Sequence, residues 1–153
     1  MLNNIIKFIV TGGYFGLSPI VPGTVGTIPG LLIFILISTQ LYLYWIVTLL
    51  IIVIGIWFSS IAEKEIFHTK DSREIVIDEI AGFLITMSFF TIYDGWEYIL
   101  TGFFLFRVFD ILKPPPINRL QDLKGGWGVM ADDLLAGLYS NVILQIVRYL
   151  LTN

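Results

Sequence analysis

The chain has 153 residues, of which 56% are hydrophobic and 14% are charged, and its net charge is -3 at pH 7. A soluble domain has about a quarter charged residues, so this composition predicts an integral membrane protein, and the lack of a basic excess argues against nucleic-acid binding. With no cysteine and one histidine, the chain excludes thiolate chemistry and sites built on paired histidines.

The N-terminal part is expected to contain a short or re-entrant helix, because residues 16–30, GLSPIVPGTVGTIPG, mix glycine and proline with apolar residues. Irregular backbone at membrane depth is tolerated only where protein or water covers it. One interpretation is a broken helix whose glycines allow close packing. The other is a phosphate-binding segment made of backbone amides and threonine hydroxyls, with Gly23, Thr24, Gly26 and Thr27 as its residues.

Long apolar segments follow. Residues 28–60 are interrupted only by Ser38-Thr39-Gln40, which predicts two spanning helices joined by a tight turn or one long bent segment. A spanning helix needs about 20 mostly apolar residues, and three more candidates lie at 75–93, 97–113 and 131–151. The sequence therefore predicts an all-α membrane bundle with about five transmembrane helices, forming one domain over residues 1–153.

The distribution of lysine and arginine predicts which ends of these helices face the cytoplasm. The loops at 61–74 and 113–130 are basic, whereas those near 38–44 and 92–97 contain neither residue type. We therefore expect both basic loops at the cytoplasmic face, with Arg148 as the exception. In this topology the polar features of the apolar segments all lie at that one face.

Asp78 and Glu79 are adjacent carboxylates in the apolar run IVIDEIAG, residues 75–82. One interpretation is simple stabilisation by the dipole at a helix N-terminus. We favour a functional role, because ionisable residues inside membrane segments usually belong to functional sites. Gly82 lies one helical turn after Asp78 and leaves that face open to another helix or a ligand.

Arg107 and Asp110 lie three residues apart in FRVFDILKPPP, residues 106–116, and so share a helix face. They are interpreted either as a structural ion pair between helices or as part of a site. In the second case Arg107 binds a phosphate through its planar donors, and Asp110 binds metal or orients the arginine. The prolines end the helix, and Lys113 before them is a candidate for holding an anionic headgroup.

Asp132 and Asp133 begin the last apolar segment. One aspartate at a helix start is often an N-cap, but two adjacent acids exceed what one cap needs. If they meet Asp78 and Glu79 in one cavity, their repulsion requires a cation. Mg²⁺ prefers oxygen ligands and often joins carboxylates to a substrate phosphate, so the candidate metal ligands are Asp78, Glu79, Asp132 and Asp133.

Four ordered segments that cover most of the chain resemble the phosphatidylglycerophosphatase A family. They are PGTVGT at 22–27, D-x-x-x-IVIDE at 71–79, FRVFDILKPPP at 106–116 and GGWGVMADDLLAG at 125–137. The resemblance implies a Mg²⁺-dependent phosphatase of the bacterial inner membrane, which converts phosphatidylglycerophosphate to phosphatidylglycerol and phosphate. The chain departs from the family pattern at Thr27, where serine is expected, and at Ser72, where proline or histidine is common.

The expected mechanism is direct hydrolysis at the cytoplasmic face, with one or two Mg²⁺ ions promoting in-line attack by water. The catalytic candidates are Asp78, Glu79, Arg107, Asp110, Asp132 and Asp133. The candidates for contacting substrate are Gly23, Thr24, Gly26, Thr27, Arg107 and Lys113. Of these, Arg107 and Lys113 are expected to stabilise the charge of the transferring phosphoryl group. The pattern specifies neither the general base nor the oligomeric state.

The expected partners of a phosphatidylglycerophosphate phosphatase are its lipid substrate and the bilayer. Two alternative functions remain. A phosphatase for another membrane lipid phosphate or a prenyl diphosphate would share the metal site and differ in headgroup contacts. A non-enzymatic transport subunit would use the acids to line an ion path. That last class predicts polar residues through the full membrane depth, whereas the outer halves of the expected spans are nearly uncharged.

Overall fold

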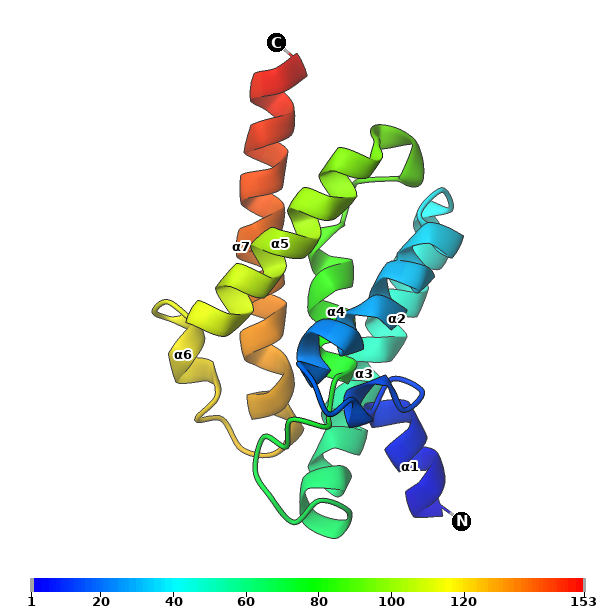
Figure 1. The fold of residues 1–153 in the computed structure, drawn as a ribbon, viewed down its shortest axis with the longest axis vertical. Helices are drawn as coiled ribbons and strands as arrows, with labels where there is room; N and C mark the ends of the chain where they lie inside the picture. Colours follow the sequence, from blue (N-terminus) through cyan, green and yellow to red (C-terminus); the bar gives the residue numbers. More distant parts are fainter. Residues whose placement is uncertain (1, 153) are drawn as a thin grey trace.

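A computed structural model describes residues 2–152, and within that range the chain is helical and contains no strand (Figure 1). The elements in chain order are α1 (Leu2–Val10), the 3-10 helix η1 (Phe15–Leu17), α2 (Pro22–Ile37), α3 (Leu41–Glu65), α4 (Ile77–Thr86), the 3-10 helix η2 (Ile92–Asp94), α5 (Trp96–Leu112), α6 (Ile117–Leu120) and α7 (Gly126–Thr152). The predicted all-α class is confirmed.

In the first half of the chain, the helices begin and end near glycine, proline and polar residues. The short or re-entrant helix expected at residues 16–30 is not present as such, because this segment holds the end of η1, a short connection and the start of the regular helix α2. Gly12 and Gly13, after α1, have φ angles of +56° and +71°, a conformation that glycine adopts readily. Pro22 occupies the start of α2, where its missing N–H costs nothing. The apolar stretch that follows is interrupted at residues 38–40, so the prediction of two helices joined by a tight turn is confirmed.

Helix α4 is shorter than the predicted segment 75–93. It has ten residues, which corresponds to about 15 Å, and eight of them are buried because α2, α3, α5 and α7 pack around it. Asn141 on α7 donates hydrogen bonds of 2.8 Å to the carbonyl oxygens of Thr86 and Ser88. These bonds satisfy the end of a helix that stops inside the bundle, which the hydropathy pattern does not reveal.

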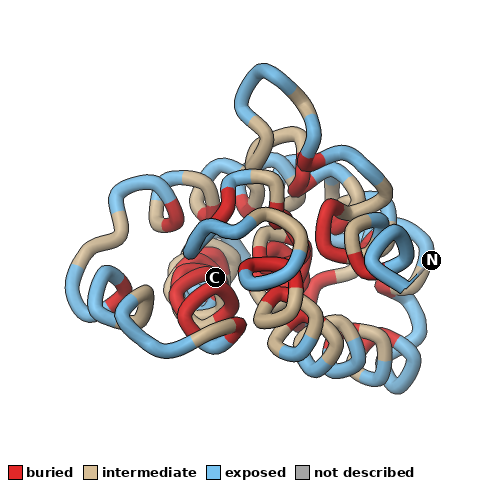
Figure 2. The backbone as a smooth tube through the Cα atoms, turned by 90° about the horizontal axis from the view of Figure 1, so that it is seen from below, coloured by how far each residue is buried: buried red, intermediate tan, exposed pale blue. Residues whose placement is uncertain are grey.

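Two helices, α3 and α7, are long and apolar enough to cross a membrane. Helices α2 and α5 have 16 and 17 residues, below the usual spanning length. The prediction of about five spans is therefore not confirmed. Buried positions lie on the inner faces of the helices and exposed positions on the outside (Figure 2).

Helices α4 and α7 cross at backbone contact distance. A Cβ atom on Gly82 would lie 2.7 Å from the carbonyl oxygen of Asp133, and one on Gly137 would meet the backbone of Gly82. Small residues permit such close crossings. The open face predicted beside Gly82 is thus occupied by another helix, and this crossing brings the second turn of α7, with Asp133, beside the first turn of α4.

The two ends of the bundle differ in character. The starts of α4 and α7, the end of α5 and the loop between α3 and α4 lie in the lower half of Figure 1, whereas the 38–40 turn, η2 and the C-terminal end of α7 lie in the upper half. Arg148, the exception in the charge pattern, lies near that upper end with local partners. It is 3.6 Å from the carboxylate of Asp94 and stacks 4.5 Å from the centre of the Phe90 ring.

Candidate active site

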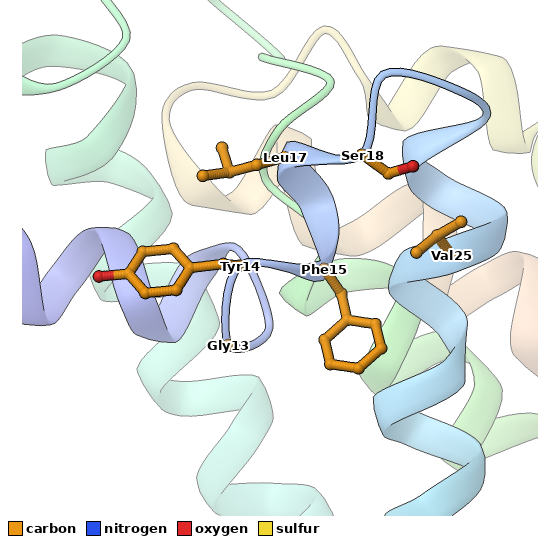
Figure 3. A pocket seen from close by; sticks show the side chains of 6 residues that line it. All are labelled: Gly13, Tyr14, Phe15, Leu17, Ser18 and Val25. Carbon is orange, nitrogen blue, oxygen red and sulfur yellow. The ribbon is translucent and has the colours of Figure 1, made fainter.

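Two hollows lie near the first turns of α2. One, between η1 and α2, is lined by six uncharged residues: Gly13, Tyr14, Phe15, Leu17, Ser18 and Val25 (Figure 3). The other is a cleft of about 340 Å³ whose walls come from the starts of α2 and α4, the end of α5, α7 and the loop before α4. Its charged lining residues are Asp71, Arg73, Asp78, Glu79, Arg107, Asp110, Lys113 and Asp133. All four sequence motifs contribute to this cleft, which makes it the candidate active site.

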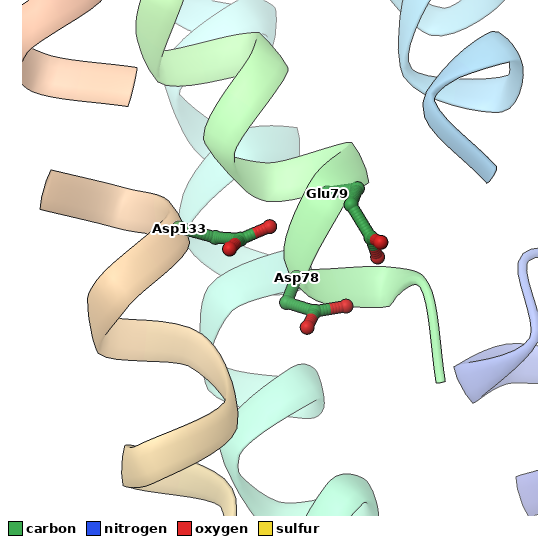
Figure 4. Close-up of side chains that lie close together, drawn as sticks. All are labelled: Asp78, Glu79 and Asp133. Atoms are coloured by element: carbon green, nitrogen blue, oxygen red, sulfur yellow. The ribbon is translucent and has the colours of Figure 1, made fainter. Parts of the chain in front are cut away.

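Three carboxylates form the centre of the cleft. Asp78 and Glu79 come from the first turn of α4 and Asp133 comes from α7, and the three side chains point toward one another (Figure 4). One oxygen atom from each lies within 4.8 Å of the others. Asp78 and Asp133 are 7% and 2% exposed. The predicted meeting of acids from two distant segments is therefore present for these three residues.

The same carboxylates are not fully satisfied by the protein. Asp78 Oδ1, Glu79 Oε2 and Asp133 Oδ2 are buried without a hydrogen-bond partner. Buried charges without partners cost several kcal/mol each, and neighbouring negative charges add repulsion. Oxygen donors at this spacing suit a hard divalent cation such as Mg²⁺, which usually binds through a few carboxylates.

Arg107 provides positive charge on one wall of the cleft. Its Nη1 atom lies 2.6 Å from Asp110 and 3.8 Å from Glu79, and all three side chains are largely buried. The predicted pairing of Arg107 with Asp110 is present. Arg107 also lines the cleft. Its ion pair with Asp110 therefore holds the guanidinium group beside the space where the carboxylates converge.

Lys113 and Asp132 form a second ion pair, with 2.5 Å between Nζ and Oδ2. Burial alone would lower the pKa of Lys113, but the hydrogen bond and charge of Asp132, helped by other nearby acids, outweigh it and raise the pKa. Asp132 is thus engaged with lysine and is not among the three carboxylates that converge within 4.8 Å. Its role as a metal ligand stays a prediction.

The four candidates in residues 22–27 have different surroundings. A Cβ atom on Gly23 would lie 2.9 and 3.1 Å from the two terminal nitrogens of Arg107, so this glycine lets α2 approach the site. Gly26 faces Val76 instead. The Thr27 hydroxyl is buried and donates to the carbonyl oxygen of Gly23 at 2.8 Å. Gly26 and Thr27 therefore serve packing within the described fold. Thr24 is half-buried and is not among the residues that line the cleft, so its contact with substrate stays a prediction.

The loop before α4 contributes residues that were not among the predicted site residues. Asp71, Ser72 and Arg73 line the cleft. The Ser72 hydroxyl donates to the carboxylate of Glu74 and holds the pKa of Glu74 below its usual value. The available signal was the D-x-x-x-IVIDE spacing, in which Asp71 is the first residue, but a single loop aspartate has no distinguishing pattern of its own.

Comparison with known proteins gives consistent matches over most of the chain. The phosphatidylglycerophosphatase A family matches residues 8–148. Phosphatidylglycerophosphatase A of Escherichia coli K12 is 34% identical over 150 residues, covering 97% of this chain and 86% of that protein. The protein of the same name from Haemophilus influenzae is 33% identical over 153 residues, covering 97% and 91%. A Bacteroides thetaiotaomicron protein provisionally named a phosphatidylinositol-3-phosphatase is 35% identical over 148 residues, covering 92% of each chain. No solved structure matches.

Proposed function

We propose that this chain, which belongs to the phosphatidylglycerophosphatase A family, hydrolyses phosphatidylglycerophosphate to phosphatidylglycerol and inorganic phosphate. The chain is a phosphatase by its family membership. The observation that carries the choice of site is the convergence of Asp78, Glu79 and Asp133 beside Arg107 in one cleft. The choice of substrate is supported by the two relatives named phosphatidylglycerophosphatase A.

The proposed cofactor is Mg²⁺, held by Asp78, Glu79 and Asp133, with Asp132 as the further predicted ligand. The unpartnered buried oxygen atoms of the first three residues support this assignment. A divalent cation at this position supplies positive charge to the phosphate and promotes attack by water.

The protein groups around that position have separate roles in the proposed reaction. Arg107 binds the phosphoryl oxygens and stabilises the charge that develops on them, while Asp110 fixes its orientation through the 2.6 Å ion pair. Gly23 keeps the wall opposite Arg107 free of side-chain atoms, and the first amides of α2 have no acceptor within their own helix. Lys113 lies at the rim, where it adds attraction for an anionic headgroup.

The proposed location is the bacterial inner membrane, in a multi-pass arrangement of about five helices with the cleft facing the cytoplasm. The apolar helices α3 and α7 support a membrane location, and the basic loops near the cleft support the orientation. Ile111, which is exposed and lines the cleft, gives the lipid an apolar edge along which its acyl chains remain in the bilayer.

A second candidate substrate is a phosphoinositide with a phosphate monoester on its inositol ring. The name of the Bacteroides thetaiotaomicron relative favours it. The same cleft chemistry applies to both substrates, because each presents a terminal phosphate monoester on a lipid headgroup.

The test is phosphate release by the purified protein in detergent, from phosphatidylglycerophosphate and from phosphatidylinositol 3-phosphate, with Mg²⁺ or with EDTA. We expect Mg²⁺-dependent release from phosphatidylglycerophosphate with the higher kcat/KM. Preference for the phosphoinositide would replace the proposed substrate. Release that is unaffected by EDTA would refute the metal assignment.

A further inference from the structure

The loop between α3 and α4 is attached to α3 by one buried carboxylate. Glu63, near the end of α3, is 8% exposed, and its Oε1 atom accepts a hydrogen bond of 2.6 Å from the backbone N–H of Asp71. A hydrogen bond to an ionised acceptor is about twice as strong as a neutral one. Asp71 has a φ angle of +51°, in a region where aspartate and asparagine are tolerated better than most residues. The turn at Asp71 is therefore held by a specific contact.

This turn puts Asp71 on the wall of the catalytic cleft. Its negative charge is close enough to act on Asp78 and Asp132. Unlike those two residues, Asp71 is exposed to solvent. It thus combines access to water with proximity to the buried acids.

The other carboxylates that line the cleft already have assignments. Asp78, Glu79 and Asp133 converge on one point, and Asp110 is paired with Arg107 at 2.6 Å. Within residues 2–152, the carboxylate of Asp71 makes no hydrogen bond or ion pair. Among the described residues of the cleft wall, Asp71 is therefore the acid that is free to accept a proton from the water molecule that attacks the phosphate.

We propose that Asp71 is the general base of the hydrolysis and that Glu63 is the positioning residue that holds it at the cleft. This inference rests on the proposed phosphatase reaction. The attacking water loses a proton to the Asp71 carboxylate while its oxygen forms a bond to phosphorus. The ester P–O bond breaks, its electron pair stays on the headgroup oxygen, and that oxygen takes a proton from solvent water. Asp71 then returns its proton to solvent at the open side of the cleft.

The two residues require different substitutions. Asp71→Asn removes the base but keeps a side chain that tolerates the left-handed backbone, and Asp71→Gly tests the same loss with no backbone penalty. Glu63→Ala removes the acceptor for the Asp71 amide. Glu63→Gln retains an acceptor oxygen and loses only the charge. Glu65→Ala, an exposed acid two residues away, is the matched control.

The experiment measures kcat and KM for phosphatidylglycerophosphate in detergent, the Mg²⁺ concentration for half activity, and the thermal unfolding midpoint of each variant. Both Asp71 variants should lose about 10²-fold or more in kcat, the usual contribution of a general base, with KM and Mg²⁺ dependence unchanged. Glu63→Ala should lose about tenfold in kcat through misplacement of Asp71. Glu63→Gln should stay within about threefold of wild type, as a weaker acceptor in the same place.

Several outcomes overturn the proposal. Near-normal kcat in the Asp71 variants removes the base assignment. Activity of those variants that recovers at high Mg²⁺ makes Asp71 a metal ligand instead. Equal losses in Glu63→Gln and Glu63→Ala show that the charge of Glu63, and not its acceptor, is what matters. An inactive wild-type protein refutes the proposed function itself, which separates that failure from failure of this inference.

Discussion

Gly23→Ala is the sharpest test of the cleft geometry, because the added methyl group would enter the space between α2 and Arg107. The new Cβ atom would lie 2.9 and 3.1 Å from the terminal guanidinium nitrogens and would also meet a carboxylate oxygen of Glu79. Ordinary carbon contacts lie near 3.5 to 4.0 Å, so Arg107 must move by about 0.5 to 1 Å. A displacement of about 1 Å costs as much as 10²-fold in rate, so we expect kcat for phosphate release to fall by about 10- to 100-fold.

Gly26→Ala supplies the matched control, three residues further along α2. Its Cβ atom would meet the buried side chain of Val76, with contacts of 2.6 and 2.9 Å to the two methyl carbons. Overpacking costs about 1 to 3 kcal/mol, against a gain of about 1 kcal/mol from replacing a helical glycine. Gly26→Ala should therefore lower the unfolding midpoint with little change in kcat per folded molecule. Gly23→Ala should change activity and not stability. Full activity of Gly23→Ala would refute the placement of α2 against Arg107.

Three further substitutions test other parts of the site and its support. Asp133→Asn should abolish phosphate release and, in EDTA, raise the unfolding midpoint, because it removes a buried acid from a cluster of three carboxylates; retained activity would remove Asp133 from the site. Arg107→Lys should lower kcat by about 10²-fold, since lysine lacks the planar donor pair; an unchanged kcat would contradict a role in phosphoryl binding. Asn141→Ala removes the donor to the Thr86 carbonyl oxygen, whereas the Ser88 carbonyl oxygen keeps a 3.3 Å hydrogen bond from Gln145; the substitution should cost about 1 to 3 kcal/mol in the free energy of unfolding, measured against the exposed control Val142→Ala on the same helix.

The parts of the fold that the sequence predicted depend on local chemistry. The break at residues 38–40 is a polar interruption in an apolar run, and the pairing of Arg107 with Asp110 follows from helical spacing. The central acids were recognisable because carboxylates are rare in apolar helices. In each case one short window of residues contains the whole signal.

The parts that the sequence did not predict depend on contacts between distant segments. The end of α4 is capped by Asn141, which lies 55 residues after Thr86. Thr27 was a plausible phosphate ligand until its helix was placed, because a threonine hydroxyl bonds its own backbone as readily as a ligand. The contribution of Asp71 depends on Glu63 and on a loop that folds back onto α3. None of these contacts produces a periodicity or a compositional bias in the sequence from which it could be predicted.

The crossing of α4 and α7 connects packing to chemistry in one contact. Besides the ring of Phe106, a Cβ on Gly82 would meet, at 2.7 Å, the backbone oxygen of Asp133, whose own carboxylate is one of the three that converge in the cleft. Asp78 and Glu79 begin the same helix that carries Gly82. A side chain at Gly82 would therefore have to push α7 away from α4, and this would also separate the carboxylate of Asp133 from those of Asp78 and Glu79. The small residues at this crossing therefore set the spacing of the acids, and the fold around α4 is built to hold that spacing.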